Sequence, residues 1–426
     1  MKKLLSYFKF FIIYLLIILY SLELFTTIFL GKKHDLPSKN LNQLRFEKSP
    51  NKENFDRRDR LRAFIEEKKK YPELSPVYRY SQSQWHLFRQ NKKIQNFLKK
   101  KINNEEIIPF RGPINKKTLG CNEDGLRRII NNDKFGFQNT NDVYLKVIDI
   151  MIIGDSFAEG ACFTEQDDIA GRIRKKTSLN AINYGISGTG PLLNLAVLIE
   201  YGSALKPKDV FYLFYEGNDM DDLMAERKTF LVNYLNDYRQ NLFQNQKNIK
   251  LFLDDFENIV YEIMQYKNFN DLDLNKTNKI QNETNNKKYI EYLKDFFELT
   301  SLRDILFPKS FHSSKKKEDI NLLSLVLSKM KKITNSWNGK LHIVYVPSWN
   351  RYNSKYSLAN YNYKRKIKKL IISNNIKFID LVEVFKKQSV DDPINLYNLG
   401  LFGHFNTRGY EIISNTIIQN TNKELN

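Results

Sequence analysis

Residues 147–154 read VIDIMIIG, an apolar run that ends at a glycine and is followed by Asp155 and Ser156. Such a nearly unbroken run is typical of a strand buried on both faces of a parallel sheet. Stretches with helical patterning separate it from four similar runs, at 181–185, 209–217, 341–347 and 376–380. Strands that alternate with helices predict right-handed crossovers and a three-layer, doubly wound α/β sheet.

The remainder of the chain divides by composition into three parts. We expect residues 1–34 to form a tail and an anchor, and 35–145 to form a spacer and an arm that packs on the main domain. The main domain is expected over 146–426. A partly helical insertion at about 220–338 interrupts it, and the Asn- and Lys-rich centre of that insertion is too polar to pack.

The N-terminal stretch predicts a membrane anchor. Residues 10–30 are apolar except for Glu23, and a helix needs about 20 apolar residues to cross a bilayer. No small-x-small cleavage site follows, so the stretch does not read as a signal peptide. The short tail before it favours a cytoplasmic N-terminus. We therefore expect a single-pass protein of the bacterial inner membrane, with its body on the periplasmic, extracytoplasmic side.

The formal net charge of +20 does not by itself indicate nucleic-acid binding. The lysines are scattered through Asn- and Ile-rich sequence and are not gathered on one helix with aromatic residues between them. The chain has two cysteines, Cys121 and Cys162. In an exported protein they are expected to pair, and the alternative is two unrelated small apolar residues. A bond between them would tie the arm to the loop that follows Ser156.

Candidate functional residues follow four of the five strands, at the point where each strand ends. They are Ser156 after the first strand, Gly188 in GISG after the second, Asn218 in EGND after the third and His404 after the fifth. The carboxyl ends of parallel strands meet at one edge of a sheet, where ligands bind. Taken singly, such a serine is often only a helix N-cap. Together, these groups match the needs of acyl transfer: a nucleophile, a base and donors for an oxyanion.

Four blocks carry a resemblance to a known family. GDSF, the glycine of GISG, GND and the histidine of GHFN occur in the order seen in the SGNH (GDSL-type) hydrolases. The resemblance covers about 147–219 and 341–415 and implies a flavodoxin-like α/β/α fold. It implies Ser156 as nucleophile, His404 as base, and Ser156, Gly188 and Asn218 as the oxyanion hole, with no cofactor. The Gly-x-Ser-x-Gly elbow of other α/β hydrolases is absent from the sequence around Ser156.

One position departs from the family pattern. The family places an aspartate three residues before its histidine, and here that position is Leu401. The acid orients the imidazole, so its loss is costly. Asp391 or Asp392 is expected to replace it if the loop folds back, or a backbone carbonyl orients the ring in a Ser-His dyad. We favour the carbonyl.

Other candidates for function are weaker. The segment after the fourth strand is a candidate substrate contact, because its rings suit a sugar and its guanidinium suits an acid: Trp349, Asn350, Arg351 and Tyr352. The glycines of GISGTG do not match a dinucleotide fingerprint. No cluster has metal-ligand spacing, so we expect no metal. The remaining histidines lie away from the strand ends or at the wrong edge of the sheet: His34, His86, His312 and His342.

Three hypotheses for function follow. The first is a membrane-anchored, exported serine esterase that removes O-acyl groups, expected to be acetyl, from an envelope glycan or a related carbohydrate. The second is an O-acetyltransferase with the same serine and histidine, which would need a multi-span membrane partner to supply its donor. The third is a non-catalytic carbohydrate-binding or assembly protein, and the missing aspartate is its main support.

Overall fold

A five-stranded parallel sheet forms the centre of the structure. The computed structural model describes residues 2–25, 41–76, 92–103, 107–266, 299, 316–353, 357–388 and 392–421. The strands are β3 (Ile150–Gly154), β4 (Ala181–Asn183), β5 (Asp209–Tyr215), β6 (Lys340–Val346) and β7 (Lys377–Asp380). Their order is β4-β3-β5-β6-β7, and all neighbours are parallel. This is the flavodoxin-like order, so the α/β sheet predicted from the apolar runs is confirmed.

Alternating side chains give the sheet two buried faces. On β3, Met151 and Ile153 belong to one core, and Ile150 and Ile152 belong to the other. The first core is closed by α8 (Pro191–Val197), α14 (Lys316–Asn335) and α16 (Ser357–Ser373). The second is closed by α7 (Ile169–Lys176), α17 (Leu381–Gln388) and α18 (Thr407–Asn420). The chain therefore folds into the three layers expected of a doubly wound domain.

The N-terminal arm shares the first of these cores. Its elements are α2 (Leu41–Lys48), α3 (Arg60–Lys70), α5 (Lys92–Asn103), the antiparallel pair β1 (Lys117–Leu119) and β2 (Ile129–Asn131), and the 3-10 helix η2 (Asn141–Leu145). Phe110, Phe135 and Phe137 are buried among the side chains of the sheet and α8. The arm is thus part of the body of the molecule and approaches the sheet closely.

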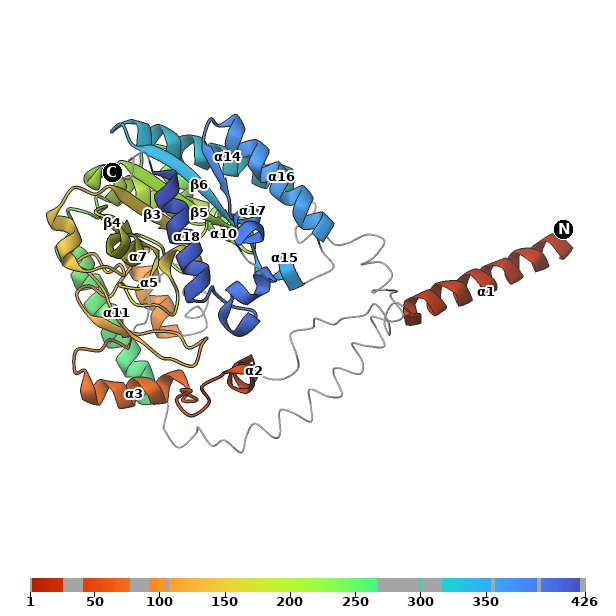
Figure 1. Cartoon of the computed structure of the whole chain (residues 1–426), viewed down its shortest axis with the longest axis horizontal. Coiled ribbons are helices and arrows are strands. Elements are labelled where there is room, and N and C mark those ends of the chain that lie inside the picture. Colours follow the sequence, from red (N-terminus) through yellow and green to blue (C-terminus); the bar gives the residue numbers. More distant parts are fainter. Residues whose placement is uncertain are drawn as a thin grey trace.

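The insertion after β5 begins with α10 (Asp219–Glu226), the 3-10 helix η4 (Phe230–Leu235) and α11 (Gln246–Tyr266). Figure 1 shows α11 beside α3, and the rings of Phe64 and Tyr261 lie 6.5 Å apart. The described part of the insertion therefore packs against the arm. Its low-complexity centre and the helix expected near 288–300 lie outside the described residues, apart from Leu299.

Short helices complete the carboxyl edge of the sheet and the turn after α8. They are α6 (Ser156–Glu159), α15 (Trp349–Asn353), the 3-10 turns η7 (Pro393–Leu396) and η8 (Asn398–Gly400), the π-helical turn η3 (Leu198–Gly202) and α9 (Ser203–Leu205). Four of them, α6, α15, η7 and η8, follow strand ends directly or belong to the loop that carries His404. Ser156 begins α6, and His404 follows η8 in the loop that leads to α18.

The first helix, α1, covers Lys2–Phe25. Among the residues that the structure describes, no helix has both the length and the apolar character to cross a membrane. This finding does not support the anchor predicted over residues 10–30, of which 26–30 lie outside the described residues.

Candidate active site

Ser156 lies at a tight turn between β3 and α6. Gly154 ends the strand with φ +146°, and a Cβ there would lie 2.7 Å from the Leu213 carbonyl oxygen and 2.8 Å from the Ala158 Cβ. Asp155 caps α6, since its carboxylate accepts from the Phe157 N–H at 2.9 Å. The capping role therefore belongs to Asp155, and the Ser156 hydroxyl is left for another partner.

That partner is His404. The Nε2 atom of His404 lies 2.7 Å from Ser156 Oγ, and its Nδ1 atom lies 3.0 Å from Glu123 Oε1. The histidine belongs to the loop between η8 and α18, and Glu123 belongs to the arm between β1 and β2. A hydroxyl, an imidazole and a carboxylate thus form one hydrogen-bonded chain. This is the arrangement of a Ser-His-acid triad.

The group that orients His404 differs from every alternative drawn from the sequence. Asp392 caps η7 by accepting from the Ile394 N–H at 3.1 Å, and Asp391 lies outside the described residues. The backbone carbonyl that we favoured is wrong, because the carboxylate of Glu123 occupies that place. Glu123 precedes His404 by 281 residues, so spacing around the histidine gives no sign of it.

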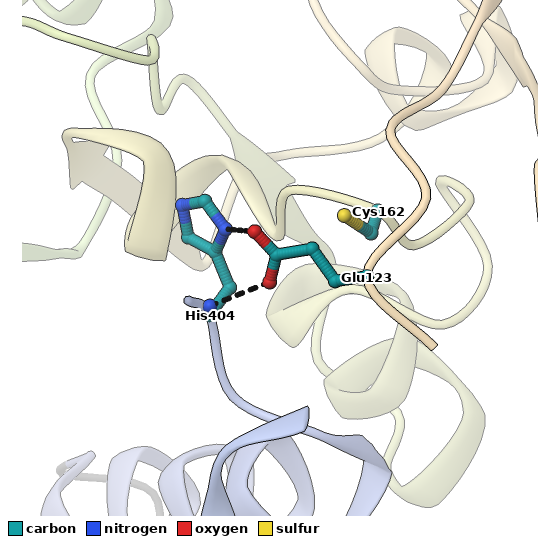
Figure 2. A group of neighbouring side chains, drawn as sticks. All are labelled: Glu123, Cys162 and His404. Carbon is teal, nitrogen blue, oxygen red and sulfur yellow. Dashed lines mark hydrogen bonds and ion pairs between the residues drawn. The ribbon is translucent and has the colours of Figure 1, made fainter. Parts of the chain in front are cut away.

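Glu123 is buried, and both of its carboxylate oxygens bind His404. Figure 2 shows its two oxygens facing the His404 ring and the His404 backbone N–H, the latter at 2.7 Å. Arg45 from α2 lies 3.2 Å from Oε1, and the Asn398 side chain donates to Oε2 at 3.4 Å. Burial alone raises the pKa of Glu123, but the charges of His404 and Arg45 and the hydrogen bonds outweigh it and hold the pKa at about 2. The group is therefore a carboxylate at any working pH.

Gly403 makes this approach possible. It has φ +155°, and a Cβ at this position would lie 2.6 Å from Glu123 Oε2 and 3.0 Å from Arg45 Nη2. The glycine before the histidine thus leaves room for the carboxylate and the guanidinium. Its backbone angle is also one that other residues rarely adopt.

The two cysteines form a disulfide between the arm and the loop after α6, with Cα atoms 4.8 Å apart. Cys121 is two residues before Glu123, and Cys162 is six residues after Ser156. The bond thus holds the acid and the nucleophile in one covalent loop. Figure 2 shows Cys162 beside Glu123 and His404, and ligand atoms of these three residues lie within 4.8 Å of one another. The Cys162 sulfur is bonded to Cys121, so it is not a thiolate available to a metal.

Gly188 and Asn218 lie at the same edge as Ser156. They follow β4 and β5, the two neighbours of β3, and the glycine-rich loop 185–190 packs between α6 and α10. A Cβ on Gly185 would overlap the backbone of Glu159 in α6, and one on Gly190 would lie 2.7 Å from Leu223 N in α10.

Within the described part of the chain, three donors at this edge have no hydrogen-bond acceptor: the Ser156 and Gly188 N–H groups and the Asn218 side-chain amide. They are free to bind an oxyanion.

Three carboxyl groups follow β3 and β5 at this edge: Asp155 and Asp219 are buried, and Asp222 is half-buried. Burial raises the pKa values of Asp155 and Asp219 above their ordinary range and raises that of Asp222 to about 6. These groups therefore keep their protons at mildly acidic pH, where ordinary aspartates are charged.

The segment after β6 is only partly a surface for substrate. The Arg351 guanidinium forms a buried ion pair with Glu216, with Nε 2.8 Å from Oε2, so it is an internal contact and not a partner for an acidic ligand. Tyr352 packs 6.4 Å from the ring of Tyr397. Trp349 lies nearer the histidine loop: its ring contacts Phe402 edge to face at 6.0 Å, and its Nε1 donates to the Gly400 carbonyl at 3.2 Å. Asn350 follows it on α15, half-buried.

The other histidines lie elsewhere. His342 is buried at the amino edge of the sheet, 2.7 Å from Asp209, which is the edge expected from the sequence. His34, His86 and His312 lie outside the described residues.

No protein-family model and no curated protein matches this chain. It is similar in structure to Axe2, an acetylxylan esterase from Geobacillus stearothermophilus, with 13% identity over 66% of this chain and 97% of that one, and a TM-score of 0.34. It is similar to a GDSL-like lipase from Parabacteroides merdae, with 11% identity over 65% and 96% of the two chains and a TM-score of 0.36. It is also similar to a G-D-S-L family lipolytic protein from Veillonella parvula, with 12% identity over 65% of this chain and 100% of that one, and a TM-score of 0.33.

The Glu123→Gln variant tests the acid. A glutamine keeps the shape but loses the charge that holds Nδ1–H, so kcat should fall by about 10²–10⁴-fold with KM little changed. The measurement is hydrolysis of p-nitrophenyl acetate by the full chain. Asp392→Asn is the matched control and should keep full activity. Equal losses in the two variants would remove Glu123 from the triad.

Removing the Cys121–Cys162 disulfide tests whether this bond positions Glu123 beside His404. Cys121→Ser combined with Cys162→Ser should lower the melting temperature, because the bond closes a loop across 41 residues. Turnover per folded molecule should also fall, because Glu123 loses its covalent link to the Ser156 loop. Thermal unfolding and active-site titration separate the two effects. Turnover per titrated site equal to that of the unaltered chain would show that the bond stabilises the fold without placing the acid.

Proposed function

We propose that this chain is an SGNH-type serine ester hydrolase that removes O-acyl groups, foremost O-acetyl, from a glycan of the cell envelope. The observation that carries the proposal is the unbroken chain of hydrogen bonds from Ser156 through His404 to Glu123. The three unpartnered donors beside Ser156 complete the requirements for acyl transfer.

The mechanism follows from these contacts. Ser156 Oγ attacks the ester carbonyl while His404 Nε2 takes its proton, and Glu123 holds the Nδ1–H of the resulting imidazolium. The oxyanion is stabilised by the Ser156 and Gly188 N–H groups and the Asn218 amide. His404 then returns the proton to the leaving alcohol, and an acyl-serine forms. Water, deprotonated by His404, attacks the acyl-serine and releases the carboxylic acid and Ser156.

The non-catalytic alternative loses its main support. It rested on the missing aspartate before His404, and Glu123 provides a buried carboxylate at the same ring nitrogen. The transferase alternative uses the same triad and is distinguished by its products.

The carbohydrate part of the proposal is supported by the aromatic pair beside the triad. Phe402 is 39% exposed and stands two residues before His404, and its ring contacts that of Trp349. Exposed aromatic rings stack on the apolar faces of sugars, so an acylated glycan is the substrate class we propose.

The proposed location is the extracytoplasmic side of the bacterial inner membrane. The Cys121–Cys162 bond supports it, because disulfides persist mainly in oxidising compartments. The side chains of α1 support a membrane contact, since apolar residues such as Phe11 and Ile17 are exposed by 63% and 56%. No nucleic-acid partner enters this proposal.

The Ser156→Ala variant tests the function. A fluorophosphonate should add once to the full chain, at Ser156, as read by intact mass and peptide mapping. Ser156→Ala should abolish both the adduct and the release of acetate from an acetylated glycan. Ser336→Ala, at the far edge of the sheet, should keep both. Acetate release that persists in Ser156→Ala would refute the assignment, and transfer of acetyl to a second glycan would identify a transferase.

A further inference from the structure

A second ion pair joins the arm to the catalytic turn. Arg111 lies in the arm and Glu159 ends α6, the helix that Ser156 begins. The Arg111 Nη2 atom lies 2.6 Å from Glu159 Oε1, and the two side chains are 2% and 1% exposed. A pair buried this deeply must recover a large desolvation cost through its other contacts. The other hydrogen bonds of these two side chains therefore indicate which part of the site the pair fixes in place.

The second oxygen of Glu159 binds the loop that follows β4. Glu159 Oε2 accepts from the Ser187 N–H at 3.0 Å, and it also accepts from the Ser187 hydroxyl. Ser187 stands directly before Gly188, whose φ of +68° turns the chain. The Ile186 N–H donates to the Gly154 carbonyl at 2.9 Å. The loop is thus fixed against the same turn that carries the nucleophile.

A second glutamate holds the other end of this loop. Glu226 of α10 accepts from the Gly190 N–H at 2.6 Å and from the Leu192 N–H at 2.9 Å. The backbone on both sides of Gly188 is therefore bound by buried carboxylates. Within the described part of the chain, the Gly188 N–H itself has no acceptor. The Gly188 N–H is therefore available to a ligand while the backbone on both sides of it is fixed.

We propose that Arg111 and Glu159 are a positioning pair that sets the Gly188 N–H in register with Ser156. The proposal rests on the proposed function and deepens it, because it assigns the arm a part in the oxyanion hole. Arg111 fixes the Glu159 carboxylate, Glu159 fixes Ser187, and Ser187 fixes the direction of the next peptide. Neither residue contacts the reacting atoms. The arm then serves both halves of the site, through Glu123 at the base and through Arg111 at the oxyanion loop.

The expected effect is a loss in the chemical step alone. Removing one oxyanion donor costs about 10²–10³ in kcat, and misplacing it costs less. Glu159→Gln keeps the shape of the side chain but breaks the ion pair, so kcat should fall by about 10–10²-fold. KM and the pH profile should stay unchanged, because Glu123 and His404 are untouched.

The test uses the full chain with three variants and a matched control. Glu159→Gln and Arg111→Met break the pair, and Arg111→Lys keeps its charge and should retain more activity. Asp209→Asn breaks another buried pair, with His342 at the amino edge of the sheet, and should leave the site unaffected. Turnover of p-nitrophenyl acetate is expressed per site titrated with a fluorophosphonate. Affinity for phenylboronic acid, which forms a tetrahedral adduct, is measured in parallel.

Hydrogen exchange over residues 184–190 gives a readout that does not depend on activity. The proposal predicts faster exchange there in Glu159→Gln but not in Asp209→Asn, with kcat per site and boronate affinity falling together. Unchanged exchange in this loop, or a kcat per site equal to that of Asp209→Asn, overturns the proposal. Faster exchange in a chain that neither labels nor hydrolyses any ester would refute the proposed function and leave the positioning of the loop standing.

Discussion

The site depends on one charged hydrogen bond, between Glu123 Oε1 and His404 Nδ1. A carboxylate only accepts hydrogen bonds, so it places the ring proton on Nδ1 and leaves the Nε2 lone pair facing the Ser156 hydroxyl. Without it the imidazole is free to carry its proton on the wrong nitrogen. Burial disfavours the charged carboxyl, but Arg45, the His404 N–H and the histidine ring stabilise that charge. The base is therefore oriented by a group that the sheet itself does not provide.

The rest of the architecture places the Glu123 carboxylate beside the residues that the sheet provides. The switch point between β3 and β5 places Ser156 and Asn218 side by side, and β4 adds the loop with Gly188. These parts come from the α/β domain alone. The acid comes from the arm, which is held by the Cys121–Cys162 bond and by aromatic side chains in the core of the sheet. Gly403 leaves the space into which the carboxylate fits.

The parts that could be predicted from sequence are those with local signals. Apolar runs located all five strands, and the residues at their ends located Ser156 and His404, because strand ends converge by topology. The acid could not be located this way, because its position depends on how the arm folds back over the sheet. The expected disulfide was the one signal available, since a bond at Cys121 brings Glu123 to the Ser156 loop. Arg351 was misjudged because its partner, Glu216, lies at the end of a different strand.

The tautomer of His404 is the sharpest test of the triad that Ser156, His404 and Glu123 form. The full chain, labelled with ¹⁵N in its histidine rings, is studied by NMR near neutral pH, and His404→Ala assigns the signals of the ring. The bond to Glu123 predicts a neutral His404 with its proton on Nδ1, at the low field typical of a hydrogen bond to a carboxylate. A neutral ring with its proton on Nε2 would rule out His404 as the base, because the nitrogen facing Ser156 would then be unable to accept the proton of the nucleophile.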